Sequence, residues 1–309
     1  MACENGLVHT YNPHLVETTT DHLYHFGISR SSDLPKEFGD VKGDLLIESL
    51  QELLDDSSGC MFVCTGGSAS RLEMFAKLFA EEAKIPLSEN LSKSDRFCMY
   101  KTGPVLWVNH GMGTPSLSIM LVEVIKLLHY AGASQVSFIR IGTSGGIGVA
   151  PGTVVVSSGA INGMLQETHV QYIMGQRVDR PAKLDAGLKD ELIATGKGLQ
   201  IPVDTGVTLC ADDFYEGQMR LDGAFCDYTS EDKFKFLRKL HDEHNVRNFE
   251  MESSCFAAMT RRAGAKAAIV CVALLNRFDG DQVKIEKEQY HEFEMRPFRL
   301  VSAFVKNKL

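Results

Sequence analysis

The segment that most constrains the fold is Val136–Gly148, with the sequence VSFIRIGTSGGIG, because it places an arginine within an apolar run. The residues around Arg140 are almost all apolar, which is typical of a central strand of a parallel sheet. Four glycines follow within seven residues and predict a turn with free backbone N–H groups. Arg140 lies near the C-terminal end of the predicted strand, and open α/β sheets bind their ligands at that edge.

Arg140 needs a partner of opposite charge, because burying an unpaired cation costs several kcal/mol. The partner is either a bound anion or a distant aspartate or glutamate, and the sequence leaves both open. Thr143, Ser144 and the glycine amides add neutral donors beside the guanidinium, and such donors favour anion binding. Inorganic phosphate or a substrate phosphate would fit an anion site of this kind.

Composition narrows the class of protein. The 309 residues are 44% hydrophobic and 23% charged, as in globular proteins, and the net charge of −8 argues against nucleic acid as a partner. The N-terminus lacks the apolar core of a signal peptide, and the longest strictly apolar run, Ala267–Leu275, is too short to span a bilayer. The eight cysteines show no close pair with metal-ligand spacing. We therefore expect reduced thiols, a cytoplasmic (cytosolic) location and no membrane partner.

Strand-like and helical runs alternate along the chain, which predicts one α/β domain around a largely parallel, twisted sheet. The predicted strands cover residues 61–64, 105–108, 135–142, 153–158, 204–210 and 267–275. The predicted helices cover 72–82, 116–130, 185–195, 230–241 and 252–263, and a last helix begins at Pro297. We expect an N-terminal extension at 1–19 and a domain over 20–309, with an acidic amphipathic insert at about 44–60.

Two glycine-containing clusters have side chains suited to ligand binding. In TGGSASR, Gly67 follows a strand and Arg71 lies one helical turn later, which predicts either a phosphate site or an ordinary turn. In FYEGQMRLDG, Gln218 offers a donor and an acceptor side by side, and Arg220 offers a planar fork of donors. This pair matches the edge of a uracil ring, on which Phe214 could pack, but a solvated surface loop would have the same sequence.

A third cluster, NFEMESS, places Glu250 and Glu252 at the start of a predicted helix. Acids there often only complement the helix dipole, although a carboxylate in a pocket can accept the two vicinal hydroxyls of a ribose. The histidine pairs of the chain lack a third metal ligand, so we expect no metal. The segment GTSGGIG departs from GxGxxG, which argues against a dinucleotide site.

Taken in order, these motifs and the segments DRFCMYKTGPVLWVNHGMGTPSLSIML and CVALLNR resemble the uridine phosphorylases of the animal type, within the nucleoside phosphorylase-I family. The resemblance extends over most of residues 20–305. It implies an α/β fold with a mixed, mostly parallel and partly barrel-like sheet. It also implies reversible phosphorolysis of uridine to uracil and ribose-1-phosphate, with deoxyuridine and thymidine as further candidates and no cofactor.

The same resemblance assigns residues to a phosphate site and to a uridine site. The implied phosphate ligands are Gly67, Arg71, Arg140 and Thr143, with Arg96 added from a second subunit. The implied uridine ligands are Ser144, Gly145, Phe214, Gln218, Arg220, Met251, Glu252 and Arg277, with His25 added from the second subunit. Arg140, Gln218 and Arg220 would be the catalytic residues, and a homodimer the smallest working unit.

The chemistry needs placement of charge more than a protein nucleophile, because uracil can leave as a delocalised anion stabilised by donors at its oxygens. The late strand ends in Leu274–Leu275–Asn276–Arg277, without an acid to protonate a purine, which favours a pyrimidine. The alternatives are a purine nucleoside phosphorylase or nucleosidase of the same family, and a non-catalytic nucleoside-binding paralogue. We expect Arg140→Ala to abolish phosphorolysis and leave the fold intact.

Overall fold

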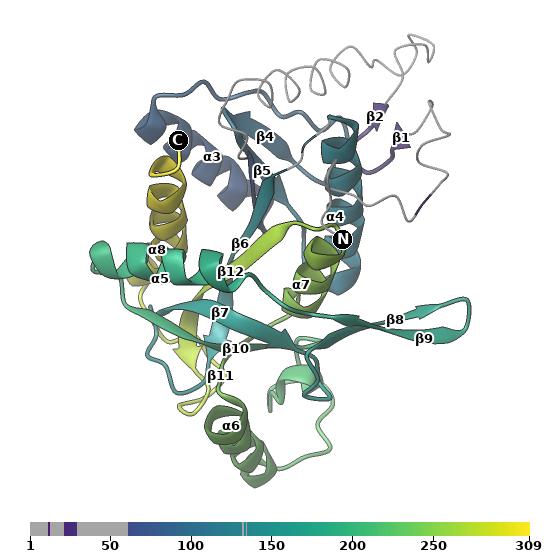
Figure 1. Ribbon diagram of the computed structural model, residues 1–309. Helices are drawn as coiled ribbons and strands as arrows, with labels where there is room; N and C mark the ends of the chain where they lie inside the picture. Colours follow the sequence, from purple (N-terminus) through teal and green to yellow (C-terminus); the bar gives the residue numbers. More distant parts are fainter. Residues whose placement is uncertain (1–11, 13–21, 30–60, 132, 134) are drawn as a thin grey trace.

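The computed structural model describes residues 12, 22–29, 61–131, 133 and 135–309 (Figure 1). The predicted insert at 44–60 lies outside these residues, as does all but residue 12 of the predicted extension at 1–19. Two short strands near the start, β1 (His22–Leu23) and β2 (Ile28–Ser29), pair with each other in antiparallel orientation.

One eight-stranded sheet forms the centre of the molecule, in the order β11-β10-β7-β12-β6-β3-β5-β4. β11 also pairs with β6, so five strands close into a ring and the remaining three extend from it. Five of the eight pairings are parallel, which confirms the mixed, mostly parallel and partly closed sheet. The strands are β3 (Met61–Gly66), β4 (Met99–Thr102), β5 (Val105–Asn109), β6 (Val136–Gly146), β7 (Val154–Ile161), β10 (Val203–Cys210), β11 (Val246–Glu250) and β12 (Lys266–Asn276).

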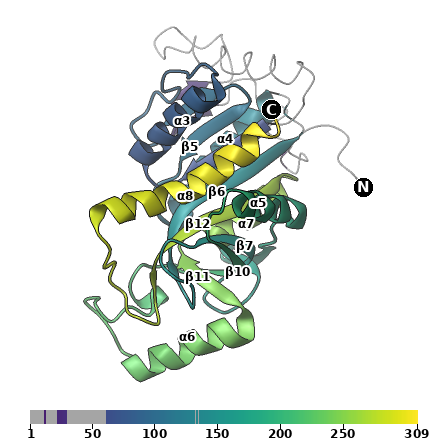
Figure 2. The ribbon, with the colours of Figure 1, turned by 90° about the vertical axis from the view of Figure 1, so that its left-hand side faces the viewer.

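Helices cover both faces of the sheet, because successive strand residues point to opposite sides. On β3, Phe62 and Cys64 pack toward one group of helices, and Val63 packs toward the other. The first group, on the side of the sheet that faces the viewer in Figure 2, consists of α3 (Ala69–Ala83), α5 (Ala186–Gly198) and α8 (Lys287–Lys306). The second group consists of α4 (Gly113–Tyr130) and α7 (Ser253–Arg262).

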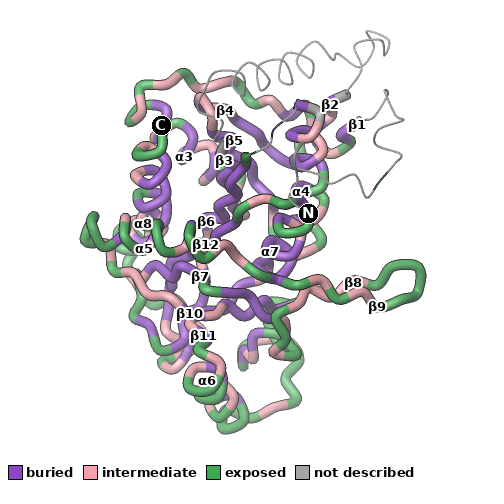
Figure 3. The backbone as a smooth tube through the Cα atoms, in the orientation of Figure 1, coloured by how far each residue is buried: buried purple, intermediate pink, exposed green. Residues whose placement is uncertain are grey.

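Two elements are largely exposed, as the tube in Figure 3 shows. The hairpin of β8 (Thr168–Ile173) and β9 (Gln176–Pro181) projects from the body of the molecule. Helix α6 (Ser230–His244) begins at a capping box, in which Thr229 and Asp232 satisfy each other's backbone N–H groups. Its buried leucines, Leu237 and Leu240, pack over β10 and β11, which keeps this polar helix on the ring of strands.

The predicted strands and helices are found at their expected places, with two corrections. Helix α8 begins at Lys287 rather than Pro297, and Pro297 lies inside it. A proline inside a helix costs about 3 kcal/mol, but the apolar face around Phe298 and Val301 is buried against the sheet and outweighs that cost.

The second correction concerns the glycine-rich turn predicted after Arg140. Strand β6 continues through these glycines to Gly146 and pairs with β12 along almost its whole length, so the segment is an extended strand rather than a turn. A Cβ at Gly142 would lie 2.9 Å from Nη1 of Arg140, and one at Gly145 would lie 2.5 Å from Nε of Arg277. The glycines therefore leave room for two guanidinium groups to lie against the strand.

Candidate active site

A cavity of about 700 Å³ opens beside the ends of β3, β6, β11 and β12. A volume of this size holds a ligand of the dimensions of a nucleoside. The cavity is lined by twelve of the fourteen predicted site residues: Gly67, Arg71, Arg140, Thr143, Ser144, Gly145, Phe214, Gln218, Arg220, Met251, Glu252 and Arg277. Segments far apart in the sequence thus meet in one place.

At one end of the cavity, Arg71 lies in the first turn of α3 and Gly67 lies in the loop before it. Ser68 caps the helix by accepting a hydrogen bond from the Arg71 N–H, at 3.4 Å. Nη1 of Arg71 lies 2.8 Å from Oε1 of Glu294, and the Arg71 side chain is 24% exposed. Arg71 is therefore an accessible cation at the rim, balanced by one carboxylate of α8.

Arg140 is the buried cation of this end, and its partners are glutamates distant in the sequence. Its Nη1 lies 3.0 Å from Oε2 of Glu250, and its Nη2 forms an ion pair with Glu252. Of the two possibilities left open by the sequence, protein carboxylates therefore partner Arg140 in this structure. Burial disfavours the charged guanidinium, but Glu250, Cys271 and Glu252 together raise the pKa of Arg140, so it stays protonated.

The two glutamates have different capacities to bind a ligand. Glu250 accepts from the N–H groups of Ser253 (2.9 Å) and Glu252 (3.0 Å) at the start of α7 and also pairs with Arg140. Glu252 accepts from Gly113 N–H (2.6 Å) and from Arg140. A carboxylate has about four lone-pair sites, so Glu252 keeps roughly two for a ligand and Glu250 roughly one. Glu252 is thus the better acceptor for sugar hydroxyls.

Charge is distributed unevenly between the same two carboxyls. Burial raises the pKa of Glu250, even though Arg140 opposes that effect. Burial also acts on Glu252, but Arg140, His110 and the hydrogen bond from Gly113 lower its pKa below the usual value. Glu252 is consequently the carboxylate that stays ionised beside the cavity.

His110 also lines the cavity, although it was not among the predicted site residues. The side chain is fully buried, and both ring nitrogens lack a hydrogen-bond partner among the described residues. Burial, followed by the charge of Arg140, lowers the pKa of His110 to about 4, so the ring is neutral near pH 7. The signal in the sequence was a histidine that follows the apolar run 105–108 and Asn109 and precedes the glycines of HGMG.

The opposite end of the cavity contains Gln218, Arg220, Phe214 and Arg277. Gln218 and Arg220 are 3% and 8% exposed, so the alternative of a solvated loop is wrong for these two side chains. Arg220 donates to Asp222 from Nε (2.9 Å) and Nη2 (2.6 Å), and its guanidinium lies 4.5 Å from the centre of the Phe214 ring. An amide, two guanidinium groups and an aromatic ring thus line the same end of the cavity.

Ser144 lies between the two ends, within β6. Its hydroxyl donates to the carbonyl oxygen of Val272 (3.2 Å) and accepts from Nδ2 of Asn248 (3.0 Å). Both roles of a hydroxyl are therefore in use within the protein, with one acceptor lone pair left. Ser144 forms part of the wall and offers a ligand a single further hydrogen bond.

His25 and Arg96 are the two predicted residues that the structure does not place at the cavity of their own chain. They lie next to each other on the surface, because the Ser94 hydroxyl bonds to the His25 carbonyl oxygen and accepts from the Arg96 N–H at 3.3 Å. The His25 ring bonds to Glu123 of α4 at 2.7 Å and is 41% exposed. Arg96 is exposed.

Comparisons with known proteins agree with this geometry. Residues 61–306 match the phosphorylase superfamily. The chain is similar to "Uridine and thymidine phosphorylase" of Caenorhabditis elegans, with 57% identity over 99% of this chain and 97% of that protein. It is 46% identical to "Uridine phosphorylase 1" of Mus musculus, over 96% of this chain and 92% of that protein. The crystal structure of a uridine phosphorylase from Schistosoma mansoni with thymidine is similar at a TM-score of 0.85 and 37% identity, covering 96% and 97% of the two chains.

No helix among the described residues is long and apolar enough to cross a membrane.

Proposed function

The chain belongs to the phosphorylase superfamily, among the uridine phosphorylases of the animal type, and from this premise we propose how its cavity acts. The protein is a glycosyltransferase that converts uridine and phosphate reversibly to uracil and ribose-1-phosphate, and it acts in pyrimidine salvage. Thymidine is a second substrate, in keeping with the C. elegans and S. mansoni proteins named above. The observation that supports this function best is one cavity lined by Arg71, Arg140 and Arg220 together with Glu252, whose pKa Arg140 lowers.

We assign phosphate to the end formed by Gly67, Arg71, Arg140 and Thr143. The ribose lies over Met251 and Glu252, where Glu252 has free acceptor positions for the hydroxyls. Ser144 and Gly145 line the wall beside it. The uracil ring lies between Gln218 and Arg220 and against Phe214, and Arg277 supports Gln218 from behind.

This arrangement brings about a displacement with inversion. A phosphate oxygen attacks C1′ of the sugar from below, and the bond from C1′ to N1 of uracil breaks with its electron pair moving into the base. Arg140 and Arg71 hold the phosphate in line, which supplies orientation rather than a covalent intermediate. Gln218 and Arg220 donate to the oxygens on which negative charge grows, so their interactions strengthen in the transition state and raise kcat.

The charges at the phosphate end support a contribution from a second subunit. Arg71 and Arg140 face Glu294, Glu250 and Glu252, so within one chain this end holds more carboxylates than guanidiniums. An additional cation would favour the binding of a phosphate dianion. Arg96 and His25 lie together on the surface, away from the cavity of their own chain. We propose a homodimer in which these two side chains reach the phosphate and the ribose of the partner's site.

Release of uracil from uridine, measured with and without inorganic phosphate, tests the activity. We expect release only with phosphate and formation of ribose-1-phosphate in equal amount. Release without phosphate would identify a nucleosidase, turnover of inosine but not uridine a purine phosphorylase, and binding without turnover a non-catalytic paralogue. Gln218→Leu should lower kcat/KM for uridine by about 100-fold or more, because it removes a donor at the leaving base.

Mixing two inactive variants tests the shared site. Arg96→Ala keeps an intact cavity, and Gln218→Leu keeps an intact Arg96, so a mixed dimer contains one complete site. With random pairing, half of the dimers are mixed and each has one working site of two, so about a quarter of the wild-type activity should return. No recovery after the subunits have exchanged, or a monomer by light scattering at assay concentration, would contradict the shared site.

A further inference from the structure

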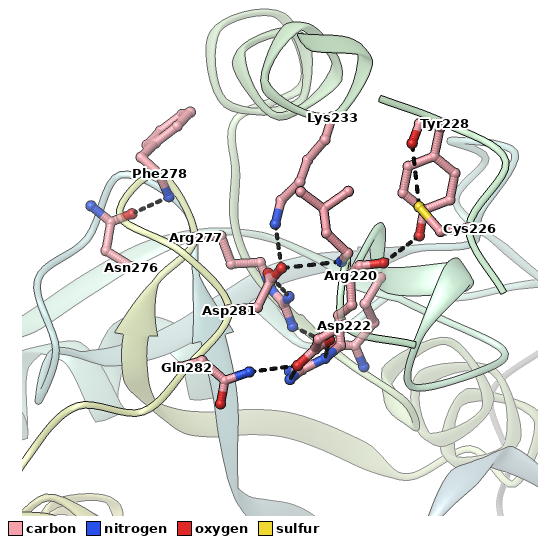
Figure 4. A network of polar contacts seen from close by, with 12 residues as sticks. Arg220, Asp222, Cys226, Tyr228, Lys233, Asn276, Arg277, Phe278, Asp281 and Gln282 are labelled. Atoms are coloured by element: carbon pink, nitrogen blue, oxygen red, sulfur yellow. Dashed lines mark hydrogen bonds and ion pairs between the residues drawn. The ribbon is translucent and has the colours of Figure 1, made fainter. Parts of the chain in front are cut away.

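At the base end of the cavity lies a network of charged side chains, and two of its members, Asp281 and Lys233, have no role in the reaction above. Figure 4 shows Asp281 at its centre. Oδ1 of Asp281 accepts from Nη1 of Arg277 at 3.1 Å, and Oδ2 accepts from Nζ of Lys233 at 2.5 Å and from the Leu221 N–H at 3.4 Å. The side chains of Arg277 and Lys233 are 2% exposed and that of Asp281 is 9% exposed, so these are buried ion pairs.

Asp281 joins three segments that are far apart in the sequence. Arg277 follows β12, Lys233 lies on α6, 48 residues before Asp281, and Leu221 lies in the loop that also contains Gln218 and Arg220. A second carboxylate makes a parallel connection, because Asp222 accepts from Arg220 and from Nε2 of Gln282 (2.5 Å). The loop that faces the base is thus fixed to the segment after β12 at two points.

The network determines how Gln218 presents its amide. Nη2 of Arg277 donates to Oε1 of Gln218, so the amide oxygen is turned toward Arg277 and the NH₂ group is left to face the ligand. Arg277 itself is confined between Gly145, Asp281 and the ring of Phe249, whose centre lies 5.3 Å from the guanidinium carbon. Asp281 therefore helps to fix Arg277, and Arg277 in turn orients the amide of Gln218, which contacts the base.

Charge gives Lys233 a separate role. Asp222 neutralises Arg220, and Asp281 is shared by Arg277 and Lys233. These three cations and two carboxylates together carry one net positive charge, and they lie beside the position proposed for the uracil ring, which becomes an anion. Without Lys233, Asp281 would cancel Arg277 and the group would be neutral, at a site where low exposure makes charge effective.

We propose that Asp281 and Lys233 are positioning residues for base recognition: Asp281 fixes Arg277 and through it the amide of Gln218, and Lys233 preserves a net positive charge beside the leaving uracil. This inference rests on the proposed uridine phosphorolysis. Neither residue touches the substrate in this scheme, and both act through side chains that do.

Kinetics of Asp281→Asn and Lys233→Met, compared with wild type, test the proposal. We expect each variant to lower kcat for uridine by about 10- to 100-fold, as misplaced reacting groups do, with KM for phosphate unchanged. Turnover of 5-fluorouridine tests the leaving group specifically, because its base is a more stable anion than uracil. In both variants, kcat for 5-fluorouridine should fall by a smaller factor than kcat for uridine. The matched control is Asp279→Asn, an exposed acid two residues before Asp281, which should leave both substrates unaffected.

A purely structural role would give a different pattern. The double variant Lys233→Met/Asp281→Leu removes Lys233 together with its carboxylate, so Arg277 is the one side chain of the two ion pairs that loses its partner. Under the proposal the double variant keeps a low kcat for uridine, because Arg277 is no longer held by Asp281. Recovery of wild-type kcat in the double variant would overturn the proposal. Equal losses with uridine and 5-fluorouridine in the single variants, or a wild-type kcat in Asp281→Asn, would overturn it as well. If the wild-type protein itself releases no uracil, it is the proposed function that fails.

Discussion

Replacing Arg140 with alanine should remove two functions of one side chain, the binding of phosphate and the neutralisation of two buried carboxylates. The side chains of Glu250 and Glu252 are 3% and 7% exposed, so water cannot replace the lost cation. Breaking a buried ion pair from one side costs about 3–5 kcal/mol. At roughly 2.1 cal/mol/K of unfolding entropy per residue, this corresponds to a fall in Tm of about 5–8 °C for this chain. The structure thus revises the expectation that the fold would be unaffected.

The pH dependence of the loss follows from the direction of the pKa shifts. In the variant, the pKa of Glu250 is raised by burial without the opposing effect of Arg140, so its folded-state pKa lies above its unfolded value. Such a carboxyl binds more protons in the folded state, so the stability deficit is largest at neutral pH. The deficit shrinks as the pH falls through the raised pKa.

The assay combines thermal unfolding at pH 5.5 and 7.5 with phosphate-dependent uracil release. Arg140→Ala should lose about 1,000-fold or more in kcat/KM, the scale of removing a buried donor at a reacting anion. Adding Glu250→Gln removes one of the two carboxylates that have lost Arg140, so the double variant Arg140→Ala/Glu250→Gln should regain stability but not activity. The reasoning is refuted if the single variant keeps the wild-type Tm, or if the double variant recovers turnover along with stability.

Two further variants test other parts of the site. Because the pKa of His110 is lowered to about 4 against about 6.5 in an unfolded chain, the protein should lose up to about 3 kcal/mol of stability as the pH falls from 6.5 to 4. His110→Asn should flatten that slope in denaturant titrations, and an unchanged slope would show that the histidine is not its source. Gly145→Ala places a Cβ 2.5 Å from Nε of Arg277, so KM for uridine should rise by about 10-fold with KM for phosphate unchanged. A parallel rise in both constants would indicate a general collapse of the cavity instead.

The sequence predicted the strands of the sheet from local apolar patterns, and the resemblance to the uridine phosphorylases supplied most of the residues that line the cavity. Strands such as β6 and β12 are buried apolar runs, and the phosphate and base clusters lie where those runs end. The partners of Arg140 could not be predicted in the same way. Glu250 meets Arg140 because β11 pairs with β6 at Gly145 and Gly146 and closes the ring of strands, and that register is a tertiary property.

Side-chain contacts between loops and helices were missed for a related reason. Lys233 has the appearance of a solvated residue on a polar helix, yet it is buried against Asp281, from a loop that follows a different strand. His110 was overlooked because a histidine beside glycines has no characteristic spacing. Both depend on how α6 and the segments after β5 and β12 pack over the cavity, which no local pattern specifies.

The glycines of GTSGG nevertheless connect the sequence to the mechanism, in a way that differs from the predicted anion cradle. They lie within strand β6, and what they offer a ligand is the absence of side chains at Gly142 and Gly145. Arg140 lies against the first and Arg277 against the second, three residues or about 10 Å further along the strand. One strand therefore contacts both the phosphate-side guanidinium and the base-side guanidinium. A reaction that relies on placement, with phosphate below the sugar and a donor at the leaving base, needs both groups held in place before the substrates bind.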